Sequence, residues 1–573
     1  TNTGSTTSSV QPQAPSGDSQ GSSTPPAPPS GGSKGTAPNA QGQPPSGQAQ
    51  PPFGSMSQGQ PPAGGMGGAN TQSFDYTGSY TGALTADGEE VRSDGNSVSA
   101  TESDQNALLA KGGGTLVVTG ASVDKSGDDN NGDNCNFYGL NSIALSVGNG
   151  SLLKISNSKL GATSEGSNGV FSTDSATAYV RDSSITTSAG NSRGLDATYG
   201  GTILADTLDI STQGDHSAGV ATDRGGGNIS LTNSTIKTAG SGSPLLYSTG
   251  DIELNNVTGS SSGSQIAGME GLNTILINNS TLESTQSGKT ASDPIADGII
   301  IYQSTSGDAE TATGKTATFQ AVGSTLKSAI TSGSMFYFTN TKADVVLKDT
   351  ALDFDSTAAN LILAAGNSSN NWGSAGSNGA AVSFTGISQT LSGNVEADTI
   401  SSVKLSLTSS TTWTGAATIR DNESATDSTK TEAPITVNVD ASSTWVVNGG
   451  STVTNLAVAD GGKVVDTSGA DVTIKDASGT VLREGSSNVT LTVTGSYSTS
   501  YDADGAGSLS SDLIDRNAFD NEYDTSTAFT LGADAQTSAS SSAHVGASAS
   551  TENSGQNWWD AIVSWFKGLF GLS

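Results

Sequence analysis

Short runs in which apolar and polar residues alternate fill the chain between about residues 77 and 470. Four stretches share one pattern: a strand-like run, then Asn or Asp, then Ser or Thr, then any residue, then Leu or Ile. They are GSLLKISNSKL (150–160), SATAYVRDSSI (175–185), GGNISLTNSTI (226–236) and LNTILINNSTL (272–282). GGTILADTLDI (200–210) is a looser copy. The pattern therefore recurs about every 25 residues, a period typical of solenoid proteins.

A second short strand follows each copy of the repeat, as in NGVFSTD, RGLDATY, AGVATDR and SPLLYST. A rung of two or three such strands cannot bury its apolar side chains alone, but stacked rungs can. The sequence therefore predicts an all-β fold, a right-handed parallel β-helix with almost no α-helix. The positions expected to face inward are Leu153, Ile155, Val180, Ile203, Ile229, Leu231, Ile252, Leu254, Ile275 and Ile277.

Changes in composition divide the chain into five segments. Residues 1–74 are rich in Pro, Gly, Ser and Gln and are expected to be a disordered linker. The β-helix is expected over residues 75–470, followed by a β-rich cap or final rungs over 471–530. Residues 531–556 read as a second flexible linker, and residues 557–573 as an amphipathic aromatic helix.

The balance of charge narrows the range of partners. The formal net charge is −31 and the pI is near 4.1. Proteins that bind nucleic acid neutralise its phosphates with Lys and Arg, so we expect this chain to bind neither nucleic acid nor anionic lipid. An acidic surface rich in Ser and Thr indicates an extracellular, cell-surface location. Cys135 is the sole cysteine, so no disulfide can form within the chain, and we expect it to be buried.

Several stretches resemble a known family. GDNCNFYGLNSIAL, GLDATYGGTI, DRGGGNISLTNS, GSPLLYSTGDI and DGIIIYQSTSGD are similar to segments of pectin-lyase-like β-helices in bacterial surface and adhesin-like proteins. SSTTWTGAATI and SSTWVVNGGSTVTNLAV resemble the terminal rungs of autotransporter passengers. The resemblance implies the β-helix fold and a protein exposed at a bacterial cell surface.

Enzymes of the pectin-lyase-like class often use carboxylates, calcium and a basic residue on one outer face. The rung pattern places Asp174, Tyr199, Arg224, Thr249 and Glu270 roughly above one another, with Asp196 and Asp223 at neighbouring positions. Arg224 between carboxylates is compatible with an acidic-sugar site or with a plain ladder of ion pairs. His216 is the sole histidine of the repeat region and is expected at a corner, so no Ser-His-Asp triad or other catalytic site is predicted.

KSGDDNNGDNCNFYG (125–139) holds three aspartates and four asparagines. Calcium prefers six to eight oxygen ligands, which Asp128, Asp129, Asp133 and nearby asparagines can supply. The spacing of an EF-hand is not met, because Asn134 and Leu140 stand where that loop needs Gly and Glu. Two interpretations remain: a solvated polar loop that leads into a strand, and a loop stabilised by calcium.

The last segment, NWWDAIVSWFKGLFGLS, places one apolar stripe on a helix, formed by Trp558, Ile562, Trp565 and Leu569. A helix of this length is marginal alone, so its apolar face needs a partner. We expect it to dock on protein, either on its own β-helix or by self-association. A membrane interface is the alternative, although Lys567 is the only basic residue of the segment.

These features support two classes of function and a weaker third. The first is a non-enzymatic adhesin or scaffold that binds a glycan or protein of a host or microbial surface, with calcium as the one possible cofactor. The second is a lyase or hydrolase that acts on polysaccharides. The third is a subunit of a self-assembling filament or surface layer. An aromatic-lined groove with converging carboxylates would favour the enzyme, and a flat polar face would favour adhesion.

Overall fold

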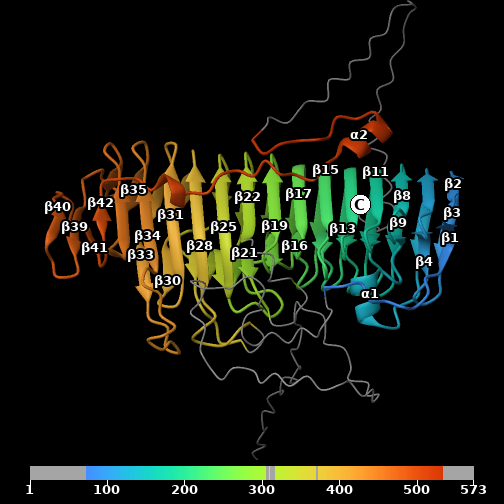
Figure 1. The fold of residues 1–573 in the computed structure, drawn as a ribbon, viewed down its shortest axis with the longest axis horizontal. Coiled ribbons are helices and arrows are strands. Elements are labelled where there is room, and N and C mark those ends of the chain that lie inside the picture. Colours follow the sequence, from blue (N-terminus) through green and yellow to red (C-terminus); the bar gives the residue numbers. More distant parts are fainter. Residues whose placement is uncertain (1–71, 305–308, 310–315, 370–371, 533–573) are drawn as a thin grey trace, which may run out of the picture. The chain divides into compact units, whose positions relative to one another are not determined.

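The structure is a computed structural model that describes residues 72–304, 309, 316–369 and 372–532 (Figure 1). The predicted N-terminal linker up to residue 71 lies outside these residues. So do most of the second linker and the aromatic segment with Trp558, Ile562, Trp565 and Leu569. The described residues form an all-β fold of stacked parallel strands, which confirms the predicted parallel β-helix.

One side of the stack is a parallel sheet in which 13 strands of the described residues lie side by side in chain order (Figure 1). We call it the 13-stranded sheet. Its strands are β1 (Gly82–Asp87), β4 (Asn106–Lys111), β7 (Ala144–Val147), β10 (Val170–Thr173), β12 (Leu195–Ala197), β14 (Val220–Thr222), β16 (Leu246–Ser248), β18 (Ala267–Glu270), β21 (Asp297–Tyr302), β24 (Ser334–Thr339), β27 (Asn360–Ala364), β30 (Val395–Asp398) and β33 (Ala417–Arg420).

The remaining sides of the rungs pair in the same parallel manner, and we call them the second sheet. Its strands are β2 (Glu90–Asp94), β3 (Ser97–Ala100), β5 (Thr115–Thr119), β6 (Ser122–Lys125), β8 (Leu152–Ser156), β9 (Lys159–Ala162), β11 (Thr177–Thr187), β13 (Thr202–Thr212), β15 (Asn228–Thr238), β17 (Asp251–Ser261), β19 (Thr274–Asn278), β20 (Thr281–Ser284), β22 (Ala317–Val322), β23 (Thr325–Ser328), β25 (Thr341–Lys348), β26 (Ala351–Asp353), β28 (Ala380–Ile387), β31 (Ser402–Thr408), β34 (Ile435–Val439), β37 (Asn455–Val458) and β42 (Tyr497–Ser498).

Two small sheets complete the last rungs. The first holds β29 (Thr390–Ser392), β32 (Thr412–Gly415), β35 (Thr444–Val447) and β38 (Lys463–Val465). The second holds β36 (Ser451–Val453), β41 (Thr490–Val493), β39 (Thr473–Asp476) and β40 (Val481–Arg483). β39 and β40 run antiparallel, unlike the other strand pairs of the described residues, so the stack of parallel rungs ends there.

The repeat found in the sequence forms one corner of the rung. Its Asn or Asp adopts a left-handed backbone conformation, as at Asn157 (φ 51°) and Asn233 (φ 53°), which Asn and Asp tolerate better than most residues. The following Ser then bridges two rungs. The Ser234 hydroxyl donates a hydrogen bond to the Thr232 carbonyl of the same rung at 2.8 Å. It also accepts a hydrogen bond from the Leu208 N–H of the preceding rung at 2.9 Å. The Asn/Asp–Ser/Thr pair thus turns the chain and replaces a ladder hydrogen bond at the bend.

The Leu or Ile of the repeat and the aliphatic residues of its strand fill the interior. All ten positions that were predicted to face inward belong to one buried cluster and are fully buried, which confirms that prediction. Aligned rungs place like residues above one another: Ile229 is level with Ile203 and with Ile252. In the last rungs Trp413 stacks on Trp445 with ring centroids 4.6 Å apart.

The polar stretch 125–139 is not a plain loop, so that interpretation was wrong in part. Gly132–Tyr138 forms helix α1, whose buried face carries Cys135 and Phe137. The Asn131 side chain caps the helix by accepting the Asn134 N–H, and Gly139 ends it in a left-handed conformation. The predicted strand over FYGLNSIAL starts only at Ala144.

The segment expected to be a β-rich cap divides in two. Residues 471–498 contain β39–β42, as the alternation predicts. Residues 499–532 contain no strand. They return along the outside of the second sheet, with a short 3₁₀ turn (Ala503–Gly505) and helix α2 (Asn517–Tyr523), and we call them the strap (Figure 1).

We predict that Ile229→Asp abolishes cooperative thermal unfolding of the β-helix, because it places an unpaired charge in the stacked core. Ile229→Ala should lower the free energy of unfolding by about 2–5 kcal/mol, as for other large-to-small core changes. Circular dichroism during heating measures both effects. Lys237→Asp, at an exposed position of the same strand, is the control and should melt like the wild type; equal melting of Ile229→Asp and wild type would contradict the stacked core.

Candidate functional site

The outer face of the 13-stranded sheet follows from the register of its strands. Leu246, Ala267 and Ile299 are aligned and point into the core. The residue after each of them therefore points outward, since side chains alternate along a strand. This places Tyr247, Gly268 and Ile300 in one outward row.

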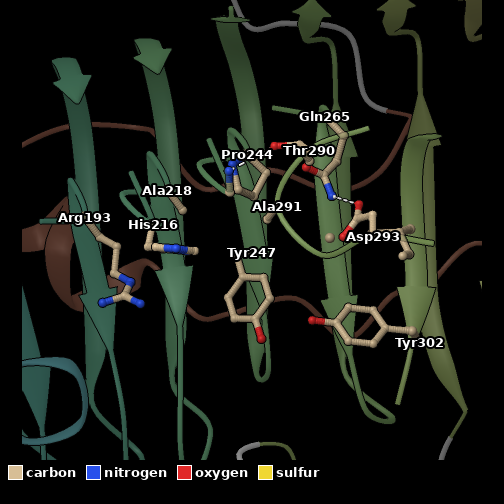
Figure 2. A pocket seen from close by; sticks show the side chains of 13 residues that line it. Arg193, His216, Ala218, Pro244, Tyr247, Gln265, Thr290, Ala291, Asp293 and Tyr302 are labelled. Carbon is tan, nitrogen blue, oxygen red and sulfur yellow. Dashed lines mark hydrogen bonds between the residues drawn. The ribbon is translucent and has the colours of Figure 1, made fainter. Parts of the chain in front are cut away.

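A narrow cavity of about 30 Å³ lies over this row, with room for one or two water molecules. We call it the cleft (Figure 2). It is lined by Arg193, His216, Ala218, Gly242, Pro244, Tyr247, Gln265, Gly268, Thr290, Ala291, Asp293, Ile300 and Tyr302. Strands β16, β18 and β21 form its floor, and the loop between β20 and β21 brings Thr290, Ala291 and Asp293 to it. Figure 2 shows Tyr247 and Tyr302 pointing toward each other.

Glu270 fixes the two tyrosines. Its carboxylate is fully buried and accepts hydrogen bonds from the Tyr247 hydroxyl at 2.7 Å and from the Tyr302 hydroxyl at 3.4 Å, as well as from the Ser304 hydroxyl. Tyr302 is held further by Trp372, whose ring stacks on it with centroids 4.3 Å apart. Burial and the neighbouring Glu270 raise the pKa of Tyr247 well above its usual range. Glu270, a predicted ligand-binding residue, thus lies outside the lining of the cleft and orients two of its lining tyrosines.

A pair of acids lies on the loop side of the cleft. Asp293 and Asp297 are both buried, and Gln265 donates to Asp293 Oδ2 at 2.9 Å (Figure 2). Burial raises the pKa of Asp293 to about 6, and burial together with Asp293 raises the pKa of Asp297 well above its usual range. Asp297 therefore keeps its proton to a higher pH than Asp293 does. This pair was not predicted from the sequence, although the two aspartates four residues apart in the otherwise uncharged DPIAD were a usable signal.

Asp196 lies on the same outer face of the 13-stranded sheet as the cleft, but it is buried. It is 0% exposed, and neither carboxylate oxygen has a hydrogen-bond partner among the described residues. Arg193 Nε lies 3.9 Å from Asp196 Oδ2, and Arg193 Nη1 donates to Asn136 of helix α1 at 2.5 Å. Burial raises the pKa of Asp196 to about 7, against the opposing effect of Arg193. Arg193 thus connects Asp196 to the helix and to the cleft.

Asp174, Tyr199, Asp223 and Arg224 form a separate group beside helix α1. The Tyr199 N–H donates to the Arg224 carbonyl at 2.8 Å, so these two residues are neighbours in successive rungs, as predicted. Asp174, with φ 52°, occupies the turn one rung earlier, and Asp223 is buried with Oδ1 accepting the Arg224 N–H at 3.0 Å. Continued register makes Glu270 level with Thr249 and Asp223, one residue before the level of Arg224. The five residues predicted to stand above one another, Asp174, Tyr199, Arg224, Thr249 and Glu270, therefore do not share one column.

Aromatic rings surround this group. The Tyr199 ring is nearly parallel to the Tyr138 ring of α1, with centroids 5.6 Å apart, and Phe74 meets it edge-on at 5.7 Å. The Arg224 guanidinium lies 3.7 Å from the centroid of the Phe137 ring, a cation–π contact. These contacts hold the N-terminal residues of the described chain and α1 against the sheet.

The three aspartates of the predicted calcium loop are spread over α1 and the turn before it. Asp128 Oδ1 accepts the Glu165 N–H at 2.9 Å, and Asp133 lies in the first turn of α1. Burial, with Glu165 and Asp104 nearby, raises the pKa of Asp129. Within residues 72–304, 309, 316–369 and 372–532, no three His, Cys, Asp or Glu side chains are grouped so as to hold a metal ion. Calcium binding stays a prediction.

Comparison with known proteins does not assign the chain to a family. No protein-family model matches the chain, and no curated protein matches it. In the part of the chain that the structure describes, neither helix has the length and apolar character needed to cross a membrane.

If the loop binds calcium, EDTA should lower the melting temperature of the full chain, because a ligand that binds only the folded state stabilises it. The double variant Asp128→Ala, Asp133→Ala should then melt at the same temperature with and without EDTA. A wild-type melting curve that EDTA leaves unchanged would contradict calcium binding.

The raised pKa of Asp196 predicts a pH effect on stability. The folded state holds the proton of this carboxyl up to about pH 7, whereas the unfolded chain releases it near its ordinary pKa of 3.8. The stability from this group is complete below pH 3.8 and is lost as the pH rises to about 7. Urea unfolding from pH 4 to 8 should therefore show a smaller decline for Asp196→Asn than for the wild type. Glu89→Gln, at an exposed position, should follow the wild type; a parallel decline for Asp196→Asn would refute the effect.

Proposed function

We propose that this chain is a non-enzymatic protein of an extracellular, bacterial cell surface that binds a glycan in the cleft of the 13-stranded sheet. The observation that carries the proposal is the pair of outward tyrosines, Tyr247 and Tyr302, fixed by the buried Glu270. The parallel β-helix supports the resemblance to pectin-lyase-like surface and adhesin-like proteins, since such folds present one long, stable face.

The chemistry of the lining suits a sugar. A tyrosine offers an apolar ring for the C–H face of a sugar and a hydroxyl for its polar edge. Gln265, Asp293 and His216 add polar groups around the rings, and binding sites typically combine apolar walls with a few such groups. Asp293, with a pKa of about 6, is largely ionised at neutral pH and can accept a hydrogen bond from a sugar hydroxyl.

The size of the cleft and the net charge of the chain limit which ligands can bind. The cleft has room only for one small substituent of a sugar, which favours recognition of a group that protrudes from a glycan over enclosure of a sugar ring or a polymer. The net charge of −31 repels polyanions, so a neutral glycan of a host or microbial surface fits best.

One observation favours the second candidate, a polysaccharide hydrolase. Paired carboxyl groups of unequal pKa supply the acid and the base of glycoside hydrolysis. Asp297, whose pKa is the higher, would hold the proton, and Asp293, with a pKa of about 6, would be the ionised partner that faces the ligand from the loop. The binding protein ranks first because Gln265 already donates a hydrogen bond to the Asp293 carboxyl group.

We predict that the full chain retains neutral glycans on a glycan array. Tyr247→Ala and Tyr302→Ala should each weaken binding at least about tenfold, the loss expected when a buried aromatic contact of about 1.4 kcal/mol or more is removed. Tyr76→Ala, a tyrosine outside the lining of the cleft, is the control and should bind like the wild type. Retention of no glycan, or unchanged binding by both cleft variants, would overturn the proposal.

Incubation of the protein with the same glycans distinguishes a binding protein from a hydrolase. A binding protein leaves them intact, whereas a hydrolase releases new reducing ends that Asp293→Asn would abolish. The appearance of such ends with the wild type alone would replace the first candidate by the second.

A further inference from the structure

The strap follows a single column of outward side chains on the second sheet. Register pairs these residues rung by rung: Lys154, Tyr179, Leu204, Ser230, Glu253, Leu276, Gln320, Val346, Thr385, Ser406 and Asn438. An outward face without a cover would be exposed, yet Ser230, Glu253 and Asn438 are buried. The strap covers them, in reverse rung order (Figure 1).

Backbone groups of the strap pair with side chains of the column at regular intervals. Asn438 and Asp502 exchange two hydrogen bonds, of 2.8 and 3.0 Å. Thr385 accepts the Gly507 N–H at 2.8 Å. Gln320 donates to the Ser508 carbonyl at 3.0 Å and accepts the Ser510 N–H at 2.8 Å. The column therefore recognises an extended backbone that crosses successive rungs.

Arg516 is the deepest contact of the strap and is only 1% exposed. Its Nη1 donates to the Ser230 carbonyl at 2.8 Å, and its Nη2 donates to the Ala205 carbonyl at 3.1 Å. Asp206 and Asp520 add favourable charge. A buried guanidinium is costly unless it is paired in this way, so the site is built for arginine.

An aromatic side chain three residues later occupies the next part of the column. Phe519 is fully buried and packs against Leu204 and the edge of the Tyr179 ring, with ring centroids 5.6 Å apart. Beyond it, Glu522 forms an ion pair of 2.8 Å with Lys154. Arginine and phenylalanine thus enter adjacent rungs in a fixed order.

From these contacts we infer that the column is a binding site for a peptide that crosses the rungs in an extended form and then enters a short helix, with an arginine just before the helix and an aromatic residue three positions later. The strap is its resident ligand, held by contacts of its own and not merely by its connection to the last rungs. It acts as a clasp that joins the rungs from β34 back to β8 and can open without unfolding the β-helix.

Glu253 makes the clasp sensitive to pH. Its Oε2 accepts the Ile514 N–H at 2.8 Å, and it faces Asp251 on its own strand and Asp512 and Arg516 on the strap. The flanking strands present Ser230 and Leu276, which do not titrate. Burial, followed by Asp251, raises the pKa of Glu253 from its ordinary value of 4.5 to about 9. Opening lets this carboxyl ionise, so closure is strongest below pH 4.5 and weakens as the pH rises to about 9.

The test uses the full chain with a protease site inserted between the exposed Thr499 and Ser500. The folded protein is cut and passed over a size-exclusion column, and release of the strap fragment is measured. We expect the wild-type fragment to stay bound at pH 6 and Arg516→Ala to release at least ten times more of it. Asn517→Ala, at the adjacent exposed position, is the control and should retain the fragment like the wild type.

Release from the cut wild type at pH 6, or equal retention by Arg516→Ala, would overturn the inference. Circular dichroism of each cut protein shows whether the β-helix remains folded; if Arg516→Ala unfolds it, Phe519→Ala replaces that variant under the same criterion. Wild-type release should rise between pH 6 and 10, and Glu253→Gln should make it flat. An unchanged pH profile of Glu253→Gln would refute the role of Glu253.

Discussion

Parallel pairing of each strand with its equivalent in the next rung is the interaction on which the rest of the structure depends. Register within such a pair decides which face every side chain occupies, and a slip of one residue would exchange the two faces. Here Ile203, Ile229 and Ile252 coincide in successive rungs, so one aliphatic column fills the interior. The serine bridges at the corners preserve this alignment where the backbone bends, as Ser234 does for Leu208.

The same alignment creates columns on the outside, and two of them are covered. The strap covers the column that contains Glu253. In the column that runs from Asp196 through Ala221 to Tyr247, contacts of helix α1 lie over Asp196 through Arg193 and Asn136, and the loop after β20 reaches Tyr247. Each cover removes acids from water and raises their pKa values, because burial disfavours the charged form. The candidate binding groups and the pH-sensitive groups of the described chain therefore arise from one cause.

Residues inside the rungs were predictable from sequence, whereas the covers were not. Alternation and the Asn–Ser corner identify Ile229 or Leu254 as inward, since the core requires apolar side chains at those positions. Outward residues are under no such rule: Ser230 and Glu253 look like solvent-exposed residues of a strand. Only the returning strap buries them, and its polar sequence shows no periodicity that links it to a column some 260 residues earlier.

Only part of the candidate site could be predicted from the sequence. Glu270 and Asp196 were identified from the rung pattern, but their partners Tyr302 and Arg193 were not. Tyr302 belongs to the next rung, after a long insertion that breaks the repeat period, and Arg193 acts through a helix that the pattern of residues 125–139 did not indicate. Contacts between neighbouring rungs of regular length could be read from the sequence; contacts that depend on insertions could not.

The register of the rungs can be measured directly with engineered disulfides. Parallel neighbours about 4.8 Å apart lie within the range that a disulfide spans, and residues more than about 7 Å apart do not. In a Cys135→Ser background, the aligned pair Ser211→Cys and Lys237→Cys should cross-link under mild oxidation, whereas Ser211→Cys and Thr235→Cys, two residues out of register, should not. Preferential cross-linking of the offset pair would contradict the stacking on which the core, the cleft and the strap column all depend.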